Sequence, residues 1–96
     1  MLILPIKKEW YDMIKSGEKK EEYRERKPYW TTRFEKYLLD KENKPFEVMF
    51  RNGYGDDKPT IKCLVNIDID YGKYNWGANI GEIYYVLRIL NVEKIK

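Results

Sequence analysis

Apolar positions near the N-terminus follow first strand spacing and then helix spacing. Residues 2–6 form a short apolar run, which is typical of a buried strand. Within residues 7–16, Trp10, Met13 and Ile14 stand at i, i+3 and i+4, so they share one face of a helix. The pattern predicts a strand followed by an amphipathic helix.

The stretch GEKKEEYRERK, at positions 17–27, is charged almost throughout. Gly17 predicts the end of the helix, and the missing apolar i, i+4 spacing argues against another one. An extended segment would place Lys20, Glu22 and Arg24 on one face, and Lys19, Glu21 and Tyr23 on the other. Charges on both faces are unusual unless one face borders a polar cleft. We interpret the segment as a strand that lines a pocket.

Helical spacing returns in residues 29–39, where Trp30, Phe34, Tyr37 and Leu38 stand at i, i+4, i+7 and i+8. Thr32 and Glu35 match the S/T-x-x-E pattern that caps a helix start. We therefore expect a second helix here, with its apolar face against the core.

The remainder of the chain predicts strands at residues 46–51, 61–70 and 83–90. The first two alternate apolar and polar residues, and the last is apolar almost throughout, as in the interior of a sheet. The order β-α-β-α-β-β-β predicts one α+β domain spanning residues 1–96. We expect a small barrel or curved sheet of five to six strands, mostly antiparallel, with two flanking helices.

The chain contains no histidine and a single cysteine, Cys63. The lack of histidine excludes Ser-His and Cys-His nucleophiles and histidine-based zinc sites. The lone cysteine excludes an internal disulfide and favours a reducing, cytoplasmic location. No apolar run approaches the roughly 18 residues that span a bilayer, and the start lacks signal-peptide features. We expect no cofactor, no metal and no membrane partner.

Aromatic content is more informative than net charge. The charge of +3 would tolerate a phosphate backbone without requiring one. Nine Tyr, three Trp and three Phe exceed what a surface would display, so most must build the core. We assign Trp10 and Trp30 to the core because they lie on apolar helical faces. Tyr54, Tyr74 and Trp76 lie in glycine-bearing loops, where a ring can stack on a base, or alternatively cap the fold and pin its loop.

The pattern Gly17-x-Lys19-x-x-Glu22-x-Arg24, directly after a helix ending in Lys-Ser-Gly, resembles the signature of ASCH domains. Two later pieces are similar to small bacterial and phage members: FRNGYG at 50–55, and Trp76-Gly77 before the closing strand. The resemblance implies a PUA-like β-barrel with a cleft beside the signature, and an RNA-binding role.

Some ASCH members are enzymes, so the resemblance also implies a possible catalytic role. One branch hydrolyses an N-acylated cytidine nucleoside with a Lys-Thr-Glu constellation, and another has ribonuclease activity. Lys19 matches the lysine of that constellation, whereas Glu22 stands where the threonine is expected, and the third carboxylate has no match here.

The candidate polar residues of the cleft are Lys7, Lys19, Glu22 and Arg24. The cations would contact phosphate or a base edge, while Glu22 would orient Arg24 or accept from an amino group. A catalytic version uses Lys19 as a desolvated base with Glu22 as its partner. Two further interpretations stay open: plain surface ion pairs in this segment, and a protein-interaction module. We expect RNA, a nucleotide or a nucleoside as the partner, and favour a monomer.

Overall fold

The computed structural model describes residues 1–93, whose elements follow the predicted order. The strands are β1 (Leu2–Ile6), β2 (Glu21–Arg24), β3 (Phe46–Asn52), β4 (Thr60–Tyr71) and β5 (Ile83–Glu93). The helices are α1 (Lys8–Ser16) and α2 (Pro28–Leu38), and the 3-10 turn η1 (Tyr74–Trp76) lies between β4 and β5. In residues 1–93 no helix has the length and hydrophobicity needed to cross a membrane. The predicted α+β class is confirmed.

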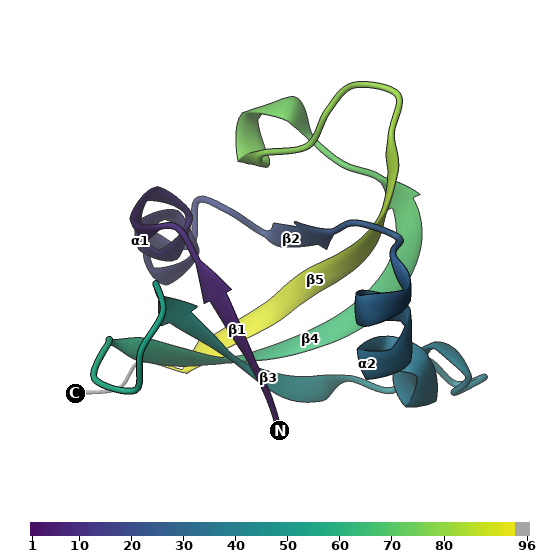
Figure 1. Ribbon diagram of the computed structural model, residues 1–96, viewed down its shortest axis with the longest axis horizontal. Coiled ribbons are helices and arrows are strands. Elements are labelled where there is room, and N and C mark those ends of the chain that lie inside the picture. Colours follow the sequence, from purple (N-terminus) through teal and green to yellow (C-terminus); the bar gives the residue numbers. More distant parts are fainter. Residues whose placement is uncertain (94–96) are drawn as a thin grey trace.

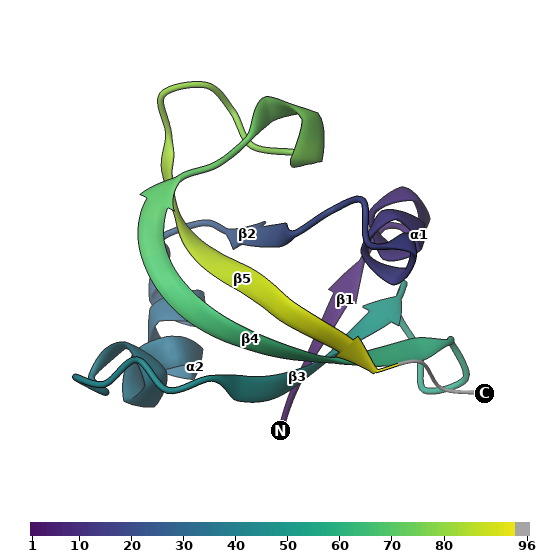
Figure 2. The same ribbon diagram turned by 180° about the vertical axis from the view of Figure 1, so that it is seen from behind.

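The five strands form one curled sheet in the order β1-β3-β4-β5-β2. β1 runs parallel to β3, and the other neighbouring strands are antiparallel, as expected. The curl is strong enough to make a half-barrel, with α1 and α2 at opposite ends (Figures 1 and 2). A register shift between Leu64 and Val65 interrupts the β4–β5 ladder, and such irregularities bend a sheet. Within the described chain, β1 and β2 are the two edges of the sheet.

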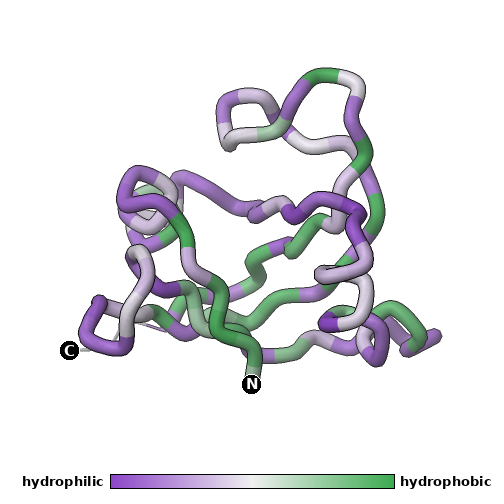
Figure 3. The backbone as a smooth tube through the Cα atoms, viewed as in Figure 1, coloured by the Kyte–Doolittle hydropathy of each residue, from purple (hydrophilic) through white to green (hydrophobic). Residues whose placement is uncertain are grey.

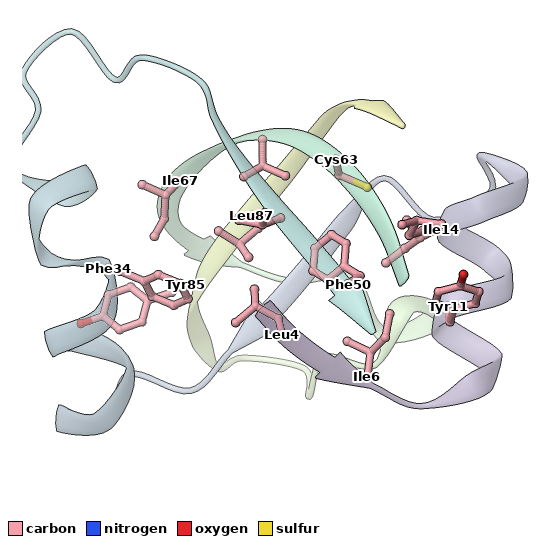
Figure 4. Close-up of a cluster of buried hydrophobic side chains, with 13 residues drawn as sticks. Leu4, Ile6, Tyr11, Ile14, Phe34, Phe50, Cys63, Ile67, Tyr85 and Leu87 are labelled. Carbon is pink, nitrogen blue, oxygen red and sulfur yellow. The ribbon is translucent and has the colours of Figure 1, made fainter. Parts of the chain in front are cut away.

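Side chains from the concave face fill the half-barrel between the two helices (Figure 4). The alternation predicted for β3 is confirmed, with Phe50 fully buried. Tyr11 and Ile14 bring α1 into the core, and Phe34 brings α2 against Tyr85 of β5, with ring centroids 5.7 Å apart. The core therefore joins both helices to the sheet.

The start of α2 corrects one expectation. The predicted capping box is wrong, because Thr32 lies inside the helix and Lys27 is the N-cap residue. Pro28 occupies the first helical position, where its fixed φ suits a helix and its missing N–H would be unpaired anyway. The proline that ends the charged segment thus also begins α2.

Replacing Phe34 tests how α2 is held. Phe34→Ala should lower the free energy of unfolding by about 3–5 kcal/mol, because a fully buried ring is lost. Leu39→Ala, at an exposed position just after α2, should change it by less than about 0.5 kcal/mol. Urea denaturation followed by circular dichroism measures both. Equal values for the two variants would contradict the packing described here.

Candidate functional site

The charged segment leaves α1 through a tight turn and runs extended along the open side of the sheet. Gly17 ends the helix with φ of 87°, a left-handed conformation that glycine adopts without a Cβ clash. The Lys19 N–H then donates to the Met13 carbonyl of the last helical turn, at 2.9 Å. In Figure 3 the chain between α1 and α2 is mostly hydrophilic. The prediction of an extended polar segment is confirmed, and the turn fixes Lys19 beside the start of β2.

A cleft of about 730 Å³ lies between β2, the end of β1, the start of α1 and the loop before β5. Six of the predicted site residues line it: Lys7, Lys19, Glu22, Arg24, Tyr54 and Trp76. Tyr74 is 74% exposed and stands outside the set of lining residues. The cleft therefore collects residues from segments far apart in the sequence.

Lys19 lies at the floor of the cleft and is only 1% exposed. Its Nζ forms an ion pair with Glu22 Oε1 at 3.0 Å and donates to the Trp76 carbonyl at 2.6 Å. The same atom lies 4.2 Å from the centroid of the Trp10 ring. An ammonium has three N–H donors, so a carboxylate, a carbonyl and an aromatic face match its full capacity. Lys19 is a buried, fully contacted cation.

Glu22 is shared between Lys19 and Arg24. Its carboxylate is buried, and its second oxygen, Oε2, lies 3.2 Å from Arg24 Nη2. Arg24 Nη2 also donates to the Pro5 carbonyl of β1 at 3.0 Å, and the guanidinium carbon lies 4.9 Å from the Trp30 ring centroid. The convergence predicted for residues 19, 22 and 24 is confirmed. One carboxylate holds two cations between the two edges of the sheet.

Burial dominates the electrostatics of this cluster. Desolvation lowers the pKa of Lys19, and the Glu22 carboxylate opposes that shift. On the other face of β2, burial raises the pKa of Tyr23, whose hydroxyl donates to Glu21 at 2.8 Å. Glu21 also pairs with Arg88 at 2.6 Å, on the outer face of the sheet. The surface ion-pair interpretation thus describes Glu21, whereas Glu22 belongs to the cleft.

The segment at residues 72–82, here called the flap, connects β4 to β5 and projects from the sheet (Figure 1). Besides the Trp76 carbonyl, it contributes Gly77, whose φ is 102° and where an added Cβ would lie 3.2 Å from the Trp10 ring. Ala78 is buried with Tyr84 and Val86 of β5 in a second apolar cluster, separate from the main core. The flap is therefore fixed from both sides. The resemblance to ASCH domains includes Gly77, but its packing on Trp10 could not be predicted from the sequence.

Trp10 and Trp30 correct the sequence assignment. Both were expected in the core, and each does pack against it, but both are half-buried and line the cleft. Each ring lies beside one cation of the cluster, Trp10 by buried Lys19 and Trp30 by partly exposed Arg24. Their helical spacing gave no sign of this, because a face turned to a cleft and a face turned to a core have the same period.

Comparisons with protein-family models, with curated proteins and with solved structures gave no match. In residues 1–93, no three side chains of His, Cys, Asp or Glu gather as metal ligands. What the site can do therefore follows from its own chemistry: one buried and one partly exposed cation, the carboxylate that they share, and several aromatic rings around a cleft.

Removing Lys19 should destabilise the fold. Lys19→Met keeps an unbranched side chain, one atom shorter, and leaves Glu22 buried with Arg24 as its remaining cation. We expect the free energy of unfolding to fall by about 1–3 kcal/mol, because the Trp76 carbonyl and Glu22 Oε1 lose their buried donor. Lys20→Met, at the exposed neighbouring position, should change it by less than about 0.5 kcal/mol. Urea denaturation at pH 7 compares them, and equal stabilities would show that the ammonium is not held as described.

The lowered pKa of Lys19 gives a signed pH dependence. As pH rises toward 10.5, the native state releases this proton before the unfolded chain does, so the unfolded chain binds more protons. The free energy of unfolding of the wild type should therefore rise relative to that of Lys19→Met, by at most about 1.4 kcal/mol per pH unit. Denaturation curves of both proteins between pH 8 and 10.5 measure this difference. A difference that falls with pH would contradict desolvation as the main cause.

Proposed function

We propose that the protein binds RNA or a free nucleotide in this cleft, with a base stacked on an aromatic ring. The observation that carries the proposal is the cluster formed by buried Lys19 and Glu22 with partly exposed Arg24 in an aromatic-lined cavity. Charged groups that line a cleft while buried are uncommon outside functional sites. A nucleotide offers what such a site recognises: a flat ring, polar base edges and a phosphate.

The size and walls of the cleft support a ligand of this kind. Its volume of about 730 Å³ falls within the range of small-molecule sites. Trp10 and Trp30 each lie beside a cation of the cluster. Tyr54 is 85% exposed and stands in the turn after β3. We assign the base-stacking role to Tyr54, because its ring is the most exposed of those that line the cleft.

The resemblance to ASCH domains agrees with this proposal. The half-barrel is compatible with a small barrel-like fold, and the cleft lies beside the Gly17-x-Lys19-x-x-Glu22-x-Arg24 pattern, where the resemblance implied it. We propose that the chain is a small ASCH-type domain of PUA-like fold. An experimental structure superposed on known ASCH domains tests that assignment separately from ligand binding.

The contacts of Lys19 favour binding over catalysis. A general base needs a free electron pair on Nζ; desolvation lowers the pKa of Lys19 in that direction, but the electron pair of a neutral amine would face the Glu22 carboxylate, the Trp76 carbonyl and the Trp10 ring, which all suit a donor. We therefore rank hydrolysis of N-acylated cytidine or of RNA as the second candidate function, after binding. Turnover of either substrate by the wild type, lost in Lys19→Met under conditions where circular dichroism shows that the variant is folded, would reverse this order.

A pair of matched tyrosine variants tests the stacking role. Tyr54→Ala should weaken binding of short RNA and of mononucleotides by about 5- to 150-fold, the usual range for one base–aromatic contact. Tyr74→Ala, at another exposed loop tyrosine outside the cleft, should leave the affinity within a factor of about two. Tryptophan fluorescence titration at fixed salt measures both, and thermal unfolding checks that the fold is intact.

Two outcomes would contradict the proposal. Equal losses in Tyr54→Ala and Tyr74→Ala would show that the ring in the cleft has no special role. No binding of RNA or nucleotides by the wild type, even at low salt where phosphate contacts are strongest, would favour a protein-interaction module instead.

A further inference from the structure

We propose that Arg24 binds the phosphate group of the ligand, so the cleft takes nucleoside phosphates in preference to nucleosides. This inference rests on the proposed function and deepens it, because it assigns the anion to one side chain. It also gives Arg24 a role that Lys19 does not have, although the sequence offers no reason to distinguish these two cations.

The hydrogen-bond inventory of Arg24 leaves donors for a ligand. Both polar partners of its guanidinium within residues 1–93, the Pro5 carbonyl and Glu22 Oε2, contact the same nitrogen, Nη2. In that part of the chain, Nε is buried without a partner, and Nη1 has no hydrogen bond or ion pair. Buried donors without acceptors are uncommon in proteins. Nη1, unlike Nε, is not buried, so a phosphate oxygen in the cleft can accept from it and supply an acceptor that the protein does not.

Lys19 is a poorer candidate for the same role. Its ammonium already contacts Glu22, the Trp76 carbonyl and the Trp10 ring, and its side chain is almost completely enclosed. Arg24 is more accessible, with 16% of its side chain exposed, and it lines the cleft. Glu22 and the Trp30 ring hold the guanidinium plane, so Arg24 presents its charge and the free N–H donors of Nη1 in a fixed orientation to a phosphate.

The net charge of the Lys19, Glu22 and Arg24 cluster also favours an anionic ligand. Among residues 1–93, Glu22 is the one carboxylate within ion-pair distance of Lys19 and Arg24, so this cluster carries an excess positive charge, while Glu25 and Glu82 line the cleft without pairing with either cation. At the rim, Lys8 pairs with Asp12 at 2.6 Å. An uncompensated charge away from water is unfavourable, and a phosphate would neutralise it.

The neighbouring residues place this anion close to the base-stacking ring. The Pro5 carbonyl accepts from Arg24, and the next carbonyl, that of Ile6, accepts from the Gly53 N–H at 2.9 Å. Gly53 immediately precedes Tyr54, and Ile6 immediately precedes Lys7, which also lines the cleft. The Arg24 guanidinium and the backbone just before Tyr54 are thus hydrogen-bonded to consecutive residues of β1. That arrangement suits the phosphate and base of a single nucleotide, with Lys7 as a second cation at the rim.

An NMR titration tests the assignment directly. The probes are inorganic phosphate, the four common ribonucleosides and their 5′-monophosphates, added to ¹⁵N-labelled protein at constant salt. We expect phosphate and the monophosphates to shift the Arg24 Nε–H resonance. The best monophosphate should bind about 10- to 100-fold more tightly than its own nucleoside, as expected for charge-assisted hydrogen bonds.

The variants are compared by the ratio of nucleoside to monophosphate dissociation constants. Arg24→Gln should reduce this ratio toward one, and Arg24→Lys, which keeps the charge but not the fork, should give an intermediate value. Lys41→Gln, an exposed lysine outside the cleft, should leave the ratio unchanged. If Arg24→Gln does not fold, Arg24→Lys tests the assignment by itself: an unchanged ratio in that variant, together with no response of the wild-type Arg24 Nε–H to phosphate, would overturn it.

Two RNA hexamers of one sequence, with and without a 5′-phosphate, identify the source of the phosphate. Tighter binding of the phosphorylated hexamer indicates an RNA end. Equal binding of the two, tighter than that of mononucleotides, indicates an internal phosphodiester. Weaker binding of both than of mononucleotides indicates a free nucleotide. All three results agree with the inference, provided that Arg24→Gln removes the difference in affinity that defines each result.

The remaining outcomes separate this inference from the proposed function. Equal affinities for a nucleoside and its monophosphate would overturn the phosphate contact and leave nucleotide-type binding standing. Monophosphates that bind no better than inorganic phosphate, with no response to nucleosides, would leave an anion site and overturn the proposed function. No response to any probe would overturn both.

Discussion

One buried carboxylate organises the open side of this sheet. Glu22 contacts Lys19 and Arg24, and each cation in turn holds a backbone carbonyl from another segment: Trp76 in the flap and Pro5 on β1. The two edge strands are therefore joined by a side chain where the backbone ladder ends. Because the two cations bind both carbonyls, the cluster determines where the flap lies and how far apart the edge strands β1 and β2 are.

Stability alone does not account for such a cluster. Taking charges out of water is costly, and well-packed apolar residues often replace a buried ion pair without loss of stability. A carboxylate shared by two cations is less favourable still, because one positive charge stays uncompensated. Here the cluster also borders a cleft, and Trp10 and Trp30 lie against its cations. This arrangement has a physical rationale if a ligand brings the missing negative charge.

Much of the fold could be predicted from spacing, because alternation in β3 and β4 and the apolar face of α1 are local patterns. The cluster was harder to predict. Strict alternation would put Lys19 on the face opposite Glu22, but β2 begins at Glu21, so Lys19 lies outside the regular strand and turns inward. Likewise, Tyr54 and Tyr74 both lie in glycine-bearing loops, and only the path of each loop decides which one borders the cleft.

The same residues that build the site also protect the sheet from unwanted pairing. Exposed strand edges can pair with other chains, and short strands, charged side chains and proline reduce that risk. β2 has four residues, three of them charged, and β1 carries Pro5. If a backbone ladder joined these two edges, the barrel would close and fill the cleft with main chain. Bridging them through Arg24 keeps the edges close together while leaving room between them, so an open sheet and an accessible site are two consequences of one arrangement.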